Sequence, residues 1–348
     1  MSSRRLAILL VLALAVIGGA FWLNARRTLP RDPELGAPVL AGLAAHLDAI
    51  TGLKLVGPGE EPLVTLERHD GHWQVREAGY PADAARVRRL LLALGDLHVV
   101  EAKTRDPARH AALGVEDPSG PKAQSVRLEL EGLAVPTALI VGHAAGTQGS
   151  YVRIPGTAQA LEARPTIELP RNPHDWLARG VLDIASARIA AVEFARADGP
   201  AWRAERTSRG AAHFEVPDLP RGRELTAAGA ADPAGSAFGN LEFDDVRRAV
   251  APAPGEKRHR TVVRCFDGLV VTLEGAVAGA DHWLTLTARF DPELAARFPP
   301  TAGQPAPAAL DVKSEAARLA ATSDGFEYKI PAYRFDSIFR PREEILRH

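Results

Sequence analysis

The sequence predicts an α+β protein in which an N-terminal transmembrane helix precedes two similar units of antiparallel sheet with packed helices. Three observations lead to this prediction. One long apolar run occupies residues 6–23 and does not recur. The remainder alternates strand-like runs with short turns, which is typical of antiparallel sheets. Finally, a set of motifs in the first half of the chain returns in the second half.

Residues 6–23 are expected to form a membrane anchor. At about 1.5 Å per residue, a helix of this length spans about 27 Å, enough to cross a bilayer core. The small residues at 18–20 leave cleavage as a signal peptide open, but the apolar run continues past them. An uncleaved anchor is therefore the preferred interpretation, and Trp22 suits the headgroup level. The residues predicted to form the membrane anchor include Leu6, Leu10, Leu14, Ile17, Phe21 and Trp22.

Charges around this run do not decide its orientation, because arginines flank both ends. Large domains that follow a span translocate largely regardless of nearby charge. We therefore expect a short cytoplasmic tail and a periplasmic body on a bacterial inner membrane. Residues 1–27 would hold the tail and the anchor, and residues 28–46 a spacer.

Composition excludes several classes of protein. The net charge of −1 and the pI near 6.9 give no basic excess, so no nucleic-acid partner is expected. The single cysteine, Cys265, rules out an intramolecular disulfide and a multi-cysteine metal site. Arginine exceeds lysine and alanine is abundant, which indicates a GC-rich bacterial genome.

The repeat divides the body into two units, residues 47–181 and 182–348. Residues 169–179 and 330–340 align without a gap. Each segment predicts a closing helical turn, and its i,i+4 spacing allows an ion pair. A repeated structural pair is preferred over a partner-binding role. The repeated positions are Asp175 with Arg179, Asp336 with Arg340, and Trp73 with Trp202, each tryptophan opening a strand after a turn.

Hairpin, helix and strands are expected in the same order in both units. Asp70-Gly71 between apolar runs predicts a tight hairpin. Residues 82–97 predict a helix, with Val87, Leu90, Leu91 and Leu94 at helical spacing. Its counterpart would be a helix over 240–250. Long β-like runs follow each of them, at residues 126–142 and 261–275.

The order of several motifs resembles the DUF4340 family of bacterial envelope proteins. The motifs are YPAD at 80–83, GSYVR at 149–153, DWL at 175–177 and LEFDDVRRA at 241–249. The resemblance covers nearly the whole body and implies membrane anchoring. It also implies an accessory role beside ABC-2-type transporter or gliding-motility-like components. It carries no catalytic residues.

Other tempting motifs have structural interpretations. The glycine-rich residues 142–149 lack a following helix and a lysine, so a hairpin loop is preferred over a phosphate loop. His69 and His72 flank an exposed turn without a third ligand. The adjacent acids Asp244 and Asp245 predict a helix cap rather than an acid/base pair. We therefore predict no catalytic residue, no cofactor and no metal site.

The leading hypothesis is a non-enzymatic, single-pass protein that binds or scaffolds another envelope component, such as an ABC-type permease. Its contact with membrane lipid would be made through the N-terminal helix. Confinement beside a membrane partner raises effective concentration, so weak contacts suffice. Two alternatives remain open: an envelope enzyme acting on glycan or peptidoglycan, and a ligand-binding module using a cleft between the units.

Overall fold

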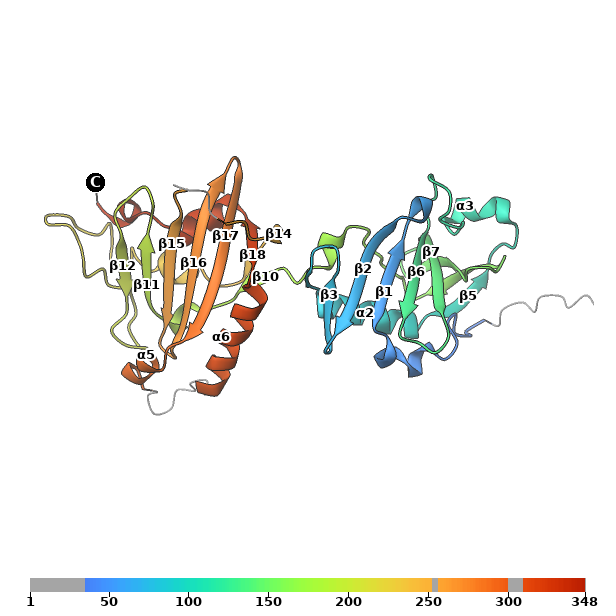
Figure 1. Cartoon of the computed structure of the whole chain (residues 1–348), viewed down its shortest axis with the longest axis horizontal. Coiled ribbons are helices and arrows are strands. Elements are labelled where there is room, and N and C mark those ends of the chain that lie inside the picture. Colours follow the sequence, from blue (N-terminus) through green and yellow to red (C-terminus); the bar gives the residue numbers. More distant parts are fainter. Residues whose placement is uncertain (1–34, 252–255, 300–308, 348) are drawn as a thin grey trace, which may run out of the picture. The chain divides into compact units, whose positions relative to one another are not determined.

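The computed structural model describes residues 35–251, 256–299 and 309–347 (Figure 1). The predicted anchor over residues 6–23, with the anchor residues named above, lies outside this part. Among the helices of the described residues, none has both the length and the apolarity of a membrane span. The body is built mostly of sheets with a few helices, which confirms the expected α+β class.

Internal contacts divide the body into two compact units. The described part of the first unit covers residues 35–68 and 85–171, and that of the second covers 69–84, 172–251, 256–299 and 309–347. The repeat in the sequence predicts a single boundary between the two units, at 181/182. In the structure, residues 69–84 are grouped with the second unit although they precede most of the first in the chain.

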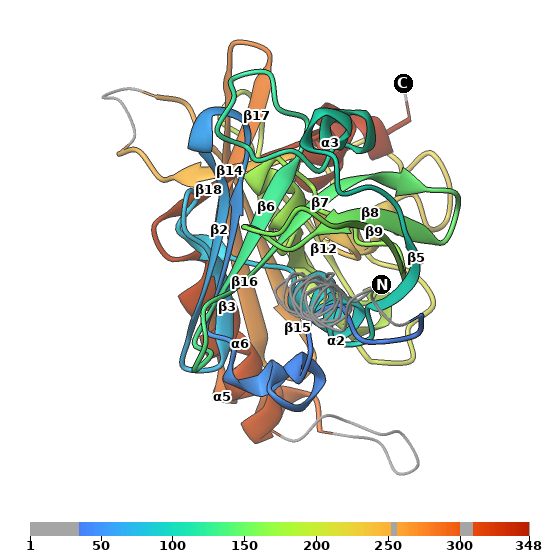
Figure 2. The same ribbon diagram turned by 90° about the vertical axis from the view of Figure 1, so that its right-hand side faces the viewer.

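The first unit is a twisted antiparallel sheet with short helical segments. Its strands follow the order β2-β1-β6-β7-β8-β9-β5, and Figure 2 shows the sheet turning strongly between β6 and β5. The bounds of its strands are β1 Gly52–Val56, β2 Pro62–His69, β5 His98–Ala102, β6 Val126–Glu131, β7 Thr137–Ala145, β8 Gly149–Arg153 and β9 Ala160–Arg164. Its helical segments are η1 Leu43–Ala45, η2 Leu47–Ala49, η3 Pro58–Glu60, α2 Ala84–Gly95, η4 Pro107–Arg109 and α3 His110–Leu113.

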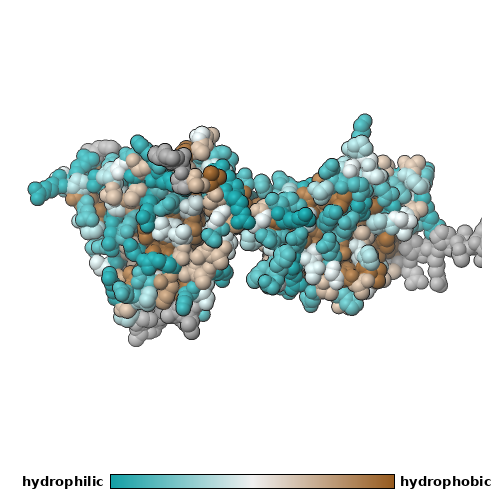
Figure 3. All heavy atoms as spheres, viewed as in Figure 1, coloured by the Kyte–Doolittle hydropathy of each residue, from teal (hydrophilic) through white to brown (hydrophobic). Residues whose placement is uncertain are grey.

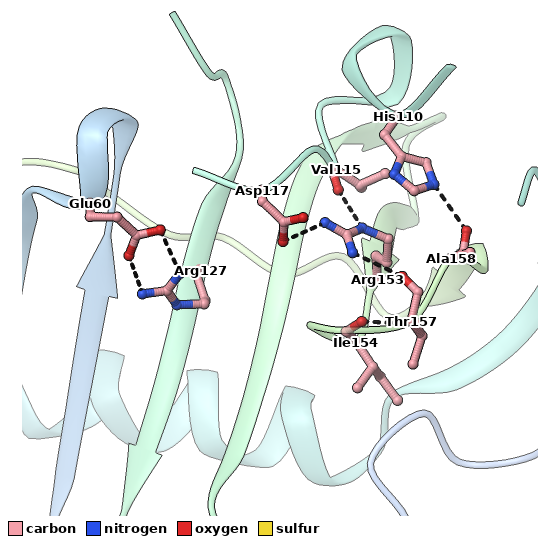
Figure 4. Close-up of polar contacts among 9 residues, drawn as sticks. All are labelled: Glu60, His110, Val115, Asp117, Arg127, Arg153, Ile154, Thr157 and Ala158. Atoms are coloured by element: carbon pink, nitrogen blue, oxygen red, sulfur yellow. Dashed lines mark hydrogen bonds and ion pairs between the residues drawn. The ribbon is translucent and has the colours of Figure 1, made fainter. Parts of the chain in front are cut away.

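Helix α2 confirms the prediction made from apolar spacing. Its buried side chains are the predicted ones, Val87, Leu90, Leu91 and Leu94. The helix runs across one face of the sheet, behind the strands in the close-up of Figure 4. An amphipathic helix on a sheet is stabilised mainly by this buried apolar stripe.

The main sheet of the second unit is also antiparallel. Its strands are β11 Ile189–Ala195, β12 Trp202–Glu205, β14 Asp245–Arg248, β15 His259–Cys265, β16 Leu269–Ala278, β17 Asp281–Phe290 and β18 Phe326–Ile330. Two short strand pairs lie outside this sheet: β3 His72–Val75 with β4 Tyr80–Pro81, and β10 Gly180–Leu182 with β13 Leu241–Glu242. The helical segments of this unit are η5 Pro173–Trp176, η6 Ser186–Arg188, α4 Pro233–Ser236, α5 Pro292–Arg297, α6 Ala309–Ser323, α7 Ala332–Ile338 and η7 Arg342–Ile345.

The two units share one strand order. Among the described residues, the main sheet of the second unit runs β12-β11-β15-β16-β17-β18-β14. It matches β2-β1-β6-β7-β8-β9-β5 position by position. In both units the opening hairpin lies at one side, four consecutive strands follow, and an earlier strand, β5 or β14, pairs antiparallel at the far edge. This common topology agrees with the repeat that the sequence predicts.

The helix predicted over residues 240–250 is wrong. This segment forms β13 and β14, and β14 pairs antiparallel with β18. Phe243 and Val246 are buried, whereas Val250, the third residue of the expected apolar face, is 65% exposed. The true counterpart of this segment is the edge strand β5, so the alignment with α2 was displaced. Asp244 and Asp245 accordingly do not begin a helix.

Part of the predicted spacer belongs to the first unit. Pro38 bridges to His98 on β5, and Val39, Leu40 and Leu43 are buried. The apolar residues at these positions place the segment on the sheet edge, because burial of such side chains is favourable.

Candidate functional site

Three of the motifs that carry the family resemblance meet in the second unit. The main chain of YPAD lies against that of DWL: Asp83 N donates to Trp176 O at 2.7 Å, and Ala178 N donates to Pro81 O at 3.0 Å. The LEFDDVRRA segment joins them where Phe243 N donates to Arg179 O at 3.1 Å. A segment from the first half of the chain thus completes the second unit.

Tyr80 is the centre of this junction. Its ring makes edge contacts with Phe243, Phe326 and Tyr328, at centroid distances of 5.5, 5.0 and 6.0 Å. Tyr80 and Tyr328 are both fully buried, and their hydroxyl oxygens lie 3.4 Å apart. Aromatic edge contacts and buried area both favour this packing, so the motifs form an apolar core with two hydroxyl groups inside it.

The chemistry of the junction is that of a packed core. Burial raises the pKa of Tyr80 and, to a smaller extent, that of Tyr328, so both hydroxyls stay protonated near neutral pH. A hollow of about 320 Å³ lies beside them. Two carboxylates line it, and both already accept hydrogen bonds: Glu315 from Arg188 Nη1 at 2.9 Å, and Asp183 from Asn240 N at 2.9 Å. The arrangement provides hydrogen-bond donors but places no free base against the hydroxyls.

The predicted i,i+4 ion pairs are not formed, although both closing helical turns are, as η5 and α7. Arg179 Nε instead donates to Phe243 O at 2.9 Å, and Arg340 pairs with Glu344 at 2.8 Å. The arginines turn away from Asp175 and Asp336 because a buried main-chain carbonyl and a better placed carboxylate are within reach.

The two tryptophans of the repeat have different environments. Trp202 is buried, stacks on Phe194 at 4.4 Å and donates from Nε1 to Arg340 O at 2.9 Å. Trp73 is half-buried. The equivalence inferred from their positions in the sequence does not extend to their degree of burial.

The GSYVR motif ends in a buried arginine that ties two loops together (Figure 4). Arg153 is 3% exposed; its Nε donates to Val115 O at 2.7 Å and its Nη1 to Thr157 O at 2.9 Å. Nη2 lies 2.8 Å from Asp117 Oδ1, but its N–H is not aligned on that oxygen, so this contact is an ion pair rather than a hydrogen bond. Beside it, His110 Nε2 lies 2.9 Å from Ala158 O.

This cluster, which we call the Arg153 clamp, joins the loop after α3 to the turn between β8 and β9. Charge-assisted bonds to carbonyls are strong in a buried site, and one planar guanidinium serves several of them at once. Sequence reasoning quoted the motif but assigned no role to its arginine. The clamp is an architectural element, because Nε and Nη1 donate to main-chain carbonyls and Nη2 makes an ion pair with Asp117.

The remaining candidates also have structural partners. Glu60, at the end of η3, is a further paired acid: it accepts from Arg127 Nη1 at 2.9 Å, and this hydrogen bond lowers the pKa of its carboxyl. Asp244 faces Arg179 and Asp245 faces His174, so the two acids do not converge. Asp70 and Gly71 both have positive φ, as the hairpin prediction requires.

The glycine-rich stretch and the cysteine behave as expected. Residues 146–148 form the turn between the antiparallel strands β7 and β8, which confirms the hairpin-loop interpretation. Cys265 is fully buried, and burial raises the pKa of its thiol. Such a thiol is a small hydrophobe rather than a nucleophile. Among the described residues, no group of His, Cys, Asp and Glu side chains could hold a metal ion.

One face of the main sheet of the second unit is polar and open. Along β15, Val263 and Cys265 are buried, while Arg264 and its alternate neighbours are partly exposed. Arg264 Nε donates to Glu193 on β11 at 3.0 Å. Two hollows of about 510 and 450 Å³ lie on this face and share Glu193, Arg203 and Arg264 as lining residues. In Figure 3, hydrophilic residues are spread over these strands, with smaller apolar patches between them.

Fold and site together define a two-unit α+β protein whose distinctive motifs serve packing. The family model described as "Domain of unknown function (DUF4340)" matches residues 73–259, and the chain belongs to this family. No curated protein and no solved structure matches the chain.

Proposed function

We propose that this protein is a single-pass, membrane-anchored accessory protein whose body lies in the periplasm and binds or scaffolds another envelope component. An ABC-type permease is the preferred partner class. The main support for the proposal is that residues of the family motifs pack and hydrogen-bond within the protein. The motif side chains at Tyr80, Trp176 and Phe243 are buried in the core. Arg153 donates hydrogen bonds to two main-chain carbonyls.

The open polar face of the second unit supports a binding role. Partly exposed arginines and glutamates in cross-strand pairs offer many donors and acceptors on a rigid sheet, which suits a wet, weak interface. The apolar run over residues 6–23 supports the anchor, because it has the length of a membrane span. An anchored protein then needs only modest affinity for a neighbour in the same membrane.

Reporter fusions test the topology. A phosphatase that is active only outside the cytoplasm, fused after His348, is expected to be active, because the body follows the apolar run. A version that lacks residues 6–23 should lose this activity and yield a folded body in the cytosol. An active cytosolic reporter at the same fusion point, with a silent phosphatase, would reverse the proposed orientation.

A further inference from the structure

The edge strand of the first unit is covered by a segment of its own chain. Gly36 N donates to Val99 O at 2.8 Å, Val99 N donates to Ala37 O at 2.9 Å, and Val39 N donates to Leu97 O at 2.8 Å. Together with the bridge from Pro38 to His98, these bonds satisfy the outer side of β5. An extended segment therefore occupies this edge in the first unit.

The equivalent edge of the second unit, β14, has no such cover among residues 35–251, 256–299 and 309–347. It occupies the last position in the sheet order and pairs on one side with β18. Ala249 N donates to Gly325 O at 2.9 Å, so alternation along the strand directs the main-chain groups of Val246 and Arg248 outward. An open strand edge is a template for another extended chain.

The outward amide of Val246 is satisfied by a side chain. Its N–H donates to Asp245 Oδ1 at 2.8 Å, whereas in the first unit the outward amide of Val99 donates to a main-chain carbonyl. On β14, the carboxylate of Asp245 therefore occupies the position that an extended segment of the chain occupies on β5. An incoming strand can replace it with a carbonyl, because the carboxylate of Asp245 is partly exposed and also faces His174 at 3.3 Å.

An apolar hollow lies at the end of this edge. Its volume is about 390 Å³. Two of its lining residues are aliphatic and unusually exposed, Val250 at 65% and Val277 at 52%. Its floor includes Trp283, on whose ring the Arg247 guanidinium lies at 3.7 Å. Figure 3 shows a small apolar patch near the tip of the β16–β17 hairpin.

The charges beside the hollow favour an acidic partner. Arg247 and Arg248 are exposed on the edge strand itself. The two acids that line the hollow are already paired: the buried Glu327 accepts from Arg247 Nη2 at 2.8 Å, and Glu256 accepts from Arg258 Nε at 3.0 Å. An added strand contributes main-chain hydrogen bonds, and a pocket for one of its alternate side chains contributes specificity.

We propose that β14 is a strand-addition site, where an extended segment of a partner protein, carrying an aliphatic residue flanked by acidic residues, adds to the sheet. Its main chain would pair with Val246 and Arg248, and its aliphatic side chain would enter the hollow beside Val250 and Val277. This inference rests on the proposed binding function and names the contact. Its failure would leave the topology result untouched.

The probe is a fluorescent synthetic peptide that alternates valine and glutamate, titrated by anisotropy into the purified full chain in detergent. Binding with a Kd between about 1 µM and 1 mM is expected. The double variant Val250→Asp with Val277→Asp should weaken binding by about tenfold or more, since it places charge in an apolar hollow. Val135→Asp is the matched control, because Val135 is 71% exposed in the first unit.

A second peptide, N-methylated at alternate amides, separates strand addition from charge attraction. It keeps the side chains but cannot complete a ladder, so its binding should be lost, and only the unmodified peptide should slow hydrogen exchange at the Arg248 amide. Equal binding of both peptides would overturn the proposal. So would no binding at about millimolar peptide, or equal affinity in the double variant.

Discussion

Replacement of Arg153 by methionine is expected to lower the free energy of unfolding of the first unit by about 3–5 kcal/mol. The variant leaves the carbonyls of Val115 and Thr157 without their donors in a site where Arg153 is 3% exposed. Arg153→Lys should recover only part of this loss, because one ammonium cannot reproduce the planar set of donors. Denaturant unfolding monitored by circular dichroism measures both values.

Arg127→Met is the matched control for the clamp. Arg127 makes ion pairs with Glu60 and Glu129, whose side chains are 44% and 33% exposed, and pairs this exposed contribute at most about 1 kcal/mol each. If both methionine variants lowered the free energy of unfolding by the same amount, Arg153 would not hold the two loops together.

Replacement of Tyr80 by alanine is expected to destabilise the second unit by about 3–5 kcal/mol, as for other buried aromatic residues. The ring fills the space between Phe243, Phe326 and Tyr328. Tyr80→Phe keeps the ring and removes only a hydroxyl 3.4 Å from its partner, so it should cost about 1 kcal/mol or less. Hydrogen exchange resolved by region measures where the loss falls.

The region in which hydrogen exchange becomes faster shows whether residues 69–84 stabilise the second unit or, as a division of the chain at 181/182 would imply, the first. Faster exchange is expected in β14 and β18, with β6 and β7 nearly unchanged, because residues 69–84 are grouped with the second unit. Acceleration confined to β6 and β7 would show that Tyr80 stabilises the first unit instead.

Local patterns predicted much of the fold. Apolar spacing identified α2, and the β-like runs predicted over 126–142 and 261–275 coincide with β6 and β7 and with β15 and β16. These features depend on neighbouring residues in the chain, and period and turn chemistry report them directly. The common strand order of the two units also agrees with the motifs that recur along the sequence.

The errors and omissions arise where distant segments decide the structure. In LEFDDVRRA, Phe243 and Val246 fit a helical face as well as a strand, and only pairing with β18 selects the strand. A short apolar pattern cannot separate the two. The contact of YPAD with DWL joins residues far apart in the chain, so no local signal reports it. Arg179 and Arg340 likewise contact groups that their i,i+4 spacing from Asp175 and Asp336 does not predict.

The candidate site follows the same division. A phosphate loop at residues 142–149 could be excluded from the sequence, because this motif is defined by residues that are close together in the chain. The structure has a hairpin turn there. No role could be assigned to Arg153 from the sequence, since the burial of a charged side chain depends on loops that meet only in the folded protein. The uncovered edge of β14 could not be predicted either, because the segment itself was expected to be a helix.

Crosslinking in the intact membrane shows whether the anchored protein binds another envelope component. Full-length protein is irradiated in cells with a photoreactive residue in place of Thr272, on the open face of the second unit, or in place of Val250, beside the edge strand β14. The adducts of both versions are identified by mass spectrometry. The account predicts one dominant adduct with another envelope component, preferably an ABC-type permease, and its loss when residues 6–23 are deleted. A protein recovered without any adduct, or with the same adduct after the apolar run is removed, would contradict it.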